Sequence, residues 1–155
     1  YAIPRYQVSL VRDSSVHSLV AQVRSSRDAR DVLAQYLDGV DREHFVVLLL
    51  DQKNKIIGIH TVSTGSLTAS VVHPREVFRS AIMDNASAIV ILHNHPSGDA
   101  TPSTNDIRIT KMLVEAGRVI GINVLDHVIV GKPSEQNSAG FVSLRKSGLV
   151  QFNVT

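Results

Sequence analysis

Residues 86–106 read ASAIVILHNHPSGDATPSTND, and this stretch decides the predicted fold because one polar loop joins two kinds of secondary structure in it. Its first part, 86–92, is an apolar and β-branched run, which is typical of a buried central strand. The loop 96–102 holds one glycine and two prolines, and the apolar spacing beyond it predicts a helix over 103–116 that ends at Gly117. The stretch therefore predicts a strand that leads through a sharply shaped loop into a helix.

Strand and helix patterns alternate along the rest of the chain. The segment HFVVLLLD over 44–51 is too short for a typical helix and continuously apolar, which indicates a strand buried on both faces. The further predicted elements are strand-like segments at 7–11, 55–62, 67–72, 123–131 and 141–148, and helices at 26–38, ending near Gly39, and at 74–84. Strands interleaved with helices indicate an α/β domain, of α+β type, with a central mixed sheet flanked by helices.

The composition fits one compact globular domain. The chain has 155 residues, of which 43 % are hydrophobic and 19 % charged, enough for a single core. No apolar run approaches the ~20 residues of a membrane span, so no membrane partner is expected. The absence of cysteine excludes disulfides and thiolate zinc sites and favours a cytoplasmic location. The start at Tyr1, without methionine, predicts a fragment of a longer chain.

The charge distribution leaves the class of partner open. The formal net charge is +2, and the arginines and lysines are scattered rather than gathered in one block. This pattern is typical of a solvated surface, with a nucleic-acid footprint as the alternative. Aromatic residues make up 5 % of the chain, with no tryptophan, which is few for a platform that stacks single-stranded nucleic acid. An association with DNA is therefore kept as an alternative.

Two histidines, His93 and His95, stand two residues apart at the end of the predicted central strand. In an extended chain such residues point to the same face, whereas Asn94 between them points away. Two imidazoles on one side can share one metal ion, and a third ligand would complete a catalytic zinc site with one position open for water. Asp106 is the candidate third ligand, because the loop can place the first turn of the next helix beside the strand end.

The same residues also have a purely structural interpretation. Ser103 and Asp106 are spaced as S-x-x-D, a capping-box-like helix start in which both side chains stabilise the helix N-terminus. The two histidines fit a surface or core role as well as a metal site. The interpretations overlap, because a capping residue can also hold a loop that carries a metal. The joint pattern of two histidines, a serine and an aspartate in one short segment favours the metal site.

The spacing H-x-H, seven residues, S, two residues, D is the signature of the JAMM/MPN metalloprotease family, and His93, His95, Ser103 and Asp106 match it without departure. The string HNHPSGDATPS, with VHPREVF before it and LDHVIVG after it, closely resembles the RadC-type JAB domain of bacteria. The likeness extends over about 19–149. The consecutive letters HNH do not indicate an HNH nuclease, in which these residues are spread over a much longer ββα unit.

The resemblance implies a single JAB/MPN-like domain with cytidine-deaminase-like layering over residues 19–150. Residues 1–18 are then an N-terminal extension with an edge strand, and 151–155 a C-terminal tail. The family name is linked to DNA repair, whereas the motif is that of a peptidase. The alternative to an enzyme is therefore a non-catalytic, metal-containing accessory or binding module that acts on DNA or on a protein partner.

The resemblance also assigns the site residues. A zinc ion (Zn2+) would be held by His93, His95 and Asp106, with water as the fourth ligand. Glu43, which stands just after the first predicted helix, would hydrogen-bond this water and serve as general base and then acid, and Ser103 would stabilise the oxyanion. The implied reaction is zinc-dependent hydrolysis of an amide bond, peptide or isopeptide, in an unidentified protein or peptide substrate.

Overall fold

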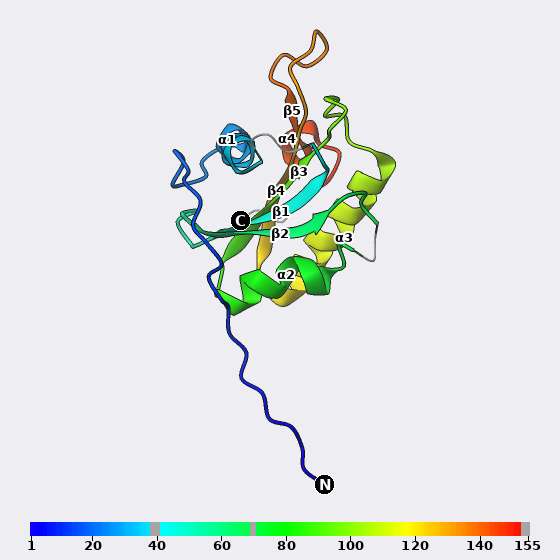
Figure 1. The fold of residues 1–155 in the computed structure, drawn as a ribbon. Coiled ribbons are helices and arrows are strands. Elements are labelled where there is room, and N and C mark those ends of the chain that lie inside the picture. The colour runs from blue at the N-terminus through cyan, green and yellow to red at the C-terminus, as the bar shows by residue number, and fades with distance from the viewer. Residues whose placement is uncertain (38–40, 69–70, 153–155) are drawn as a thin grey trace.

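The computed structural model describes residues 1–37, 41–68 and 71–152 (Figure 1). Its helices and strands, in chain order, are α1 (Ser26–Tyr36), β1 (His44–Leu50), β2 (Ile56–Thr64), α2 (Pro74–Met83), β3 (Ala88–Asn94), α3 (Thr104–Ile120), β4 (Asn123–Val130), β5 (Phe141–Ser143) and α4 (Leu144–Ser147). The alternation of strands and helices that the sequence predicted is therefore present. Across the described residues, no helix has both the length and the apolar character needed to cross a lipid bilayer.

The five strands form one mixed sheet in the order β2-β1-β3-β4-β5. β3 runs parallel to β4, and the other neighbouring strands pair antiparallel. The inner strands β1 and β3 are buried almost throughout, from Phe45 to Leu50 and from Ala88 to His93. This burial explains why both read as continuous apolar runs in the sequence. The prediction of an α/β domain around a mixed sheet flanked by helices is confirmed.

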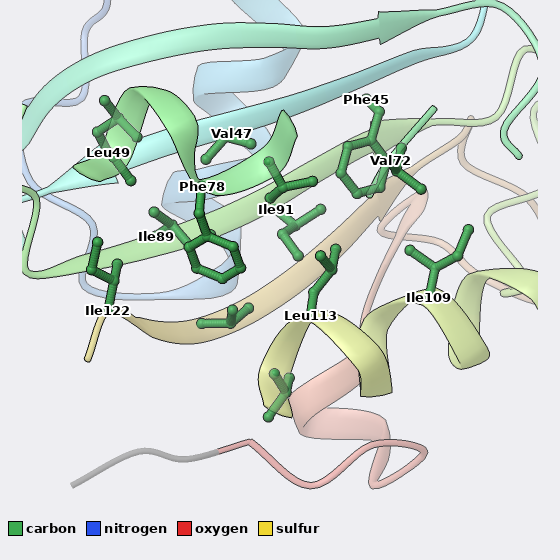
Figure 2. Close-up of a cluster of buried hydrophobic side chains, with 14 of the residues drawn as sticks. Phe45, Val47, Leu49, Val72, Phe78, Ile89, Ile91, Ile109, Leu113 and Ile122 are labelled. Carbon is green, nitrogen blue, oxygen red and sulfur yellow. The ribbon is translucent and has the colours of Figure 1, made fainter. Parts of the chain in front are cut away.

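Helices cover both faces of the sheet (Figure 1). On one face, α1 buries Leu33 against side chains of β1 such as Leu48. On the other, Phe78 of α2 and Leu113 of α3 pack against Ile91 of β3, as Figure 2 shows. Burying one such large apolar side chain contributes roughly 1.5–3 kcal/mol. Two cores, one on each face, therefore hold the inner strands in place, and the position of every side chain at the strand ends depends on them.

The helices begin where the sequence predicted, and local capping explains why. Ser25 accepts a hydrogen bond from the backbone N–H of Asp28 at 3.2 Å and so caps α1. At the start of α2, Nδ1 of His73 accepts from the N–H of Arg75 at 3.1 Å, and Pro74 occupies the first helical position. The sequence had assigned no role to His73, because a histidine N-cap has no common sequence signature.

Three predictions about strands need correction. Within the described residues 1–18 there is neither helix nor strand, so the predicted edge strand at 7–11 is absent. Residues 67, 68, 71 and 72 also take no strand conformation, and the rest of the predicted strand 67–72 lies outside the described residues, as does Gly39. The segment 141–148 divides into the short strand β5 and the helix α4. In each case the apolar pattern was too short to specify a pairing partner.

Gly117 does not end α3, contrary to the prediction. The helix continues to Ile120, and Gly121, with φ 87°, provides the left-handed cap. Gly117 is instead required by packing, since a Cβ there would lie 2.5 Å from the carbonyl oxygen of Ile122 and 3.2 Å from the ring of Phe78. The glycine therefore permits the close approach of α3 to the start of β4, a long-range contact that local sequence cannot show.

Candidate metal centre

The candidate site lies where β1 begins and β3 ends. The two strands pair antiparallel with Phe45 opposite His93, so the residue before β1 lies beside the last residues of β3. That residue is Glu43, and its Oε1 lies 2.5 Å from Nε2 of His93. Sheet register therefore brings together a carboxylate and an imidazole that are 50 residues apart in the chain.

His93 and His95 project from the same side of the strand end, as their spacing predicted. Their ring centroids are 4.9 Å apart with the planes nearly perpendicular. Glu43, His93 and His95 each offer one ligand atom, and these three atoms lie within 4.8 Å of one another, a spacing that suits a single metal ion. The structure thus places Glu43, which the sequence assigned to proton transfer, within the same cluster as the two histidines.

Asp106 lies against both histidines from the first turn of α3. Its Oδ2 is 3.1 Å from Nε2 of His95, and its Oδ1 is 3.6 Å from Nδ1 of His93. The same carboxylate accepts the backbone N–H of Ser103 at 2.8 Å, while the Ser103 Oγ accepts the N–H of Asp106 at 3.0 Å. This is a complete capping box. The capping interpretation of Ser103 and Asp106 is therefore confirmed, and the same aspartate also contacts the histidine pair.

The orientation of His95 is fixed by its second ring nitrogen. Nδ1 donates to the backbone carbonyl of Asp99 at 2.8 Å, which leaves Nε2 as the nitrogen that faces Asp106. The loop that provides this carbonyl is itself attached to the end of β4, through a hydrogen bond from the N–H of Lys132 to the carbonyl of Gly98 at 2.7 Å. Metal-binding histidines commonly donate their free N–H to a carbonyl in this way.

Comparison with known proteins shows the family of the chain. The family model for the RadC-like JAB domain matches residues 23–149, which is most of the chain. The chain belongs to this family. Its relatives include UPF0758 proteins, among them those of Caldanaerobacter subterraneus (50 % identical over 130 residues, 84 % of this chain and 53 % of the relative) and Desulforamulus reducens (47 % over 128 residues, 83 % and 54 %). The chain spans about half the length of the curated relatives that it matches.

In this RadC-like JAB domain, burial and hydrogen bonding tune the protonation of the cluster. Burial lowers the pKa of His93, against the opposing effects of Asp106 and Glu43. A hydrogen bond with Asp106 raises the pKa of His95. Burial would raise the pKa of Asp106, but hydrogen bonds from His95 and from the Ser103 N–H outweigh it and hold the pKa well below its usual range. His93 and Asp106 therefore have the protonation states that metal ligands require, a neutral imidazole and an ionised carboxylate, whereas the raised pKa of His95 favours its protonated form in the metal-free protein.

The donor atoms of the site fit a metal ion. Within the described part of the chain, the buried Nδ1 of His93 has no hydrogen-bond partner. A buried ring nitrogen without a partner is uncommon, because burying an unsatisfied polar atom costs free energy. Two imidazoles and two carboxylates within a few ångströms suit zinc and also other divalent ions of intermediate softness. The cluster could therefore bind a metal ion, and its protein donors do not single out one element.

Ser103, the predicted oxyanion donor, lies at the edge of this cluster. Ser103 is exposed, and its Oγ accepts the capping hydrogen bond from the backbone N–H of Asp106. A hydroxyl that accepts through its oxygen still has its own hydrogen to donate. Capping of α3 and donation to a substrate oxygen are therefore compatible at this side chain.

Beneath the cluster the structure places two residues to which sequence reasoning gave no defined role. His127 is fully buried in β4, and its ring centroid lies 6.0 Å from that of His93. Its Nδ1 lies 2.6 Å from the Oγ of Thr110, which donates to the carbonyl of Asp106 at 2.6 Å. Since that hydroxyl has one hydrogen, Nδ1 of His127 is the donor of the other bond. Burial lowers the pKa of His127 to about 3, so it is a neutral core histidine.

Proposed function

We propose that this domain is a zinc-dependent hydrolase of the JAMM type that cleaves an amide bond in a protein or peptide. The observation that carries the proposal is the convergence of four side chains at the end of β3. The carboxylate oxygens of Asp106 lie 3.1 Å from His95 and 3.6 Å from His93, and Oε1 of Glu43 lies 2.5 Å from His93. The proposed setting is the cytoplasm, in keeping with a chain that has no cysteine.

In this proposal His93, His95 and Asp106 hold the ion. Bound zinc would lower the pKa of a coordinated water to about 7 and polarise the scissile carbonyl. Glu43 would accept a proton at its Oε1 and return it to the leaving nitrogen. The Ser103 hydroxyl would donate a hydrogen bond to the developing oxyanion, a type of contact whose loss typically costs about 2.7–4 kcal/mol in transition-state stabilisation.

Two substitutions test the assignment of ligand and base. Asp106→Ala should abolish zinc binding, whereas Glu43→Gln should retain zinc and lose hydrolysis. The measurements are metal content after dialysis and cleavage of a peptide and isopeptide substrate library. Loss of zinc in Glu43→Gln with retention in Asp106→Ala would instead make Glu43 the third ligand and Asp106 a cap.

A matched control separates loss of a ligand from loss of a helix cap. Asp28 stands in the first turn of α1 as Asp106 does in α3, and its Oδ2 accepts the N–H of Arg24 at 2.8 Å. Asp28→Ala should therefore reduce stability to a similar extent while zinc binding stays unchanged. Full zinc binding by the wild type without cleavage of any amide would favour the accessory-module alternative over the enzyme.

A further inference from the structure

The carboxamide of Asn94 connects the end of β3 to the segment that carries Glu43. Its Oδ1 accepts the backbone N–H of His44 at 2.6 Å, and its Nδ2 donates to the carbonyl of Arg42 at 2.8 Å. These two backbone groups belong to the residues immediately before and after Glu43. One side chain thus binds the peptide groups on both sides of the candidate general base.

The other contact of these backbone groups on this side is local, between Nδ1 of His44 and the carbonyl of Arg42 at 2.9 Å, and does not tie the segment to β3. β1 begins only at His44, and Arg42 is exposed. On the opposite side, toward β2, the carbonyl of Glu43 accepts the N–H of Gly65 at 2.7 Å. The backbone at Glu43 is therefore held between Gly65 on the β2 side and Asn94 on the β3 side.

The chemistry of this contact favours asparagine over other residues. To join both groups to β3, one side chain must donate to the Arg42 carbonyl and accept from the His44 N–H, and an amide offers both from one planar group. Aspartate would supply the acceptor but would face the Arg42 carbonyl with a second oxygen. Alanine would supply neither. Because alternation turns Asn94 away from His93 and His95, this role does not compete with theirs.

We propose that Asn94 is a positioning residue that holds the Glu43 carboxylate against His93. Its contribution to hydrolysis rests on the proposed function, but its effect on Glu43 is a property of the metal-free protein. Loss of the two hydrogen bonds frees the 42–44 segment on its β3 side, so the contact between Oε1 of Glu43 and Nε2 of His93 becomes less populated.

The test measures the imidazole nitrogen signals of His93 by NMR in metal-free protein labelled with ¹⁵N-histidine. Glu43→Gln gives the reference position for a ring that has lost its carboxylate partner. Asn94→Ala should move the His93 Nε2 signal from the wild-type position toward that reference. Asn94→Asp, which keeps the size of the side chain and one of its two hydrogen bonds, should move it in the same direction by less.

Asn137→Ala is the matched control. The Asn137 amide also joins two backbone groups, since it accepts the N–H of Gly140 at 3.1 Å and donates to the carbonyl of Phe141 at 3.0 Å, but it lies in the loop before β5. This variant should leave the His93 signals unchanged. Wild-type His93 signals in both Asn94 variants would overturn the proposal. Failure of the wild type to bind zinc would refute the proposed function instead, while the metal-free comparison would still decide the role of Asn94.

Discussion

Oε1 of Glu43 lies 2.5 Å from Nε2 of His93, although the first residue precedes β1 and the second stands one residue before the end of β3. The contact follows from the register of two antiparallel strands whose apolar side chains are buried on both faces of the sheet. A one-residue change of register would move each of these side chains into the opposite core, where its packing partners differ, so close packing in both cores favours the observed pairing. The cores therefore determine where this carboxylate meets this imidazole.

Zinc should stabilise the folded domain, because only the folded state brings the ligands together. A ligand present at a hundred times its dissociation constant adds about 2.7 kcal/mol to the free energy of unfolding. We expect zinc to raise the midpoint of thermal unfolding and excess chelator to reverse the change. His95→Ala should remove the effect, whereas His60→Ala, at an exposed position of β2, should retain it. Equal zinc stabilisation in both variants would place the ion elsewhere.

Ser103→Ala should have two separable effects. Removal of an N-cap hydroxyl costs about 1 kcal/mol of stability, and removal of an oxyanion donor should lower kcat in addition. Ser25→Ala removes the equivalent cap from α1, far in the chain from the site. Denaturant unfolding should show similar losses for the two variants, while any hydrolysis should fall only in Ser103→Ala. Equal rates in the two would make Ser103 a cap without a catalytic role.

The metal-free domain should become less stable as the pH falls from 7 to 5. The pKa of His127 is lowered by burial from 6.5 to about 3, so over this range the unfolded chain binds a proton there that the folded domain does not. Burial lowers the pKa of His93 as well and adds to the effect, whereas the raised pKa of His95 opposes it. Denaturant unfolding of His127→Gln at both pH values should show a smaller loss than the wild type. An equal loss would mean that His127 is protonated in the fold.

Gly131→Ala should weaken zinc binding without touching a ligand. A Cβ at Gly131 would collide with the carbonyl of Gly98, in the loop between His95 and Ser103. Because that loop carries the Asp99 carbonyl that orients His95, we expect a lower zinc affinity in competition with a chromophoric chelator. Gly58→Ala in β2, where the nearest side-chain atom would lie 3.2 Å from the new Cβ, is the control and should bind zinc as the wild type does. Unchanged affinity in Gly131→Ala would show that the loop adapts.

Much of the site could be predicted because its residues obey local rules. Period-two alternation placed His93 and His95 on one side, and the S-x-x-D spacing gave the capping box at Ser103 and Asp106. Spacing alone could not decide whether Asp106 caps the helix or contacts the histidines. In the structure the same carboxylate does both, since it accepts the N–H of Ser103 and lies against His95.

The remaining features depend on contacts between distant parts of the chain. Alternation predicted that Asn94 points away from the histidines, but not that it bonds the backbone on both sides of Glu43. Gly117 was interpreted as a helix end because its crowding against Ile122 is invisible in the local sequence. Glu43 itself was identified only through a family resemblance, since a lone acidic residue before a strand has no distinguishing pattern.

At the end of β3, the side chains of His93 and His95 point to the candidate metal centre, whereas that of Asn94 between them points to the backbone on both sides of Glu43. Insertion or deletion of a single residue within β3 would reverse these orientations. An amide would then point to the metal centre, and imidazoles would point to the backbone beside Glu43. The strand should therefore tolerate many changes of apolar side chain but no change of length, so that viable variants of this domain would vary in length only in the loops beyond it.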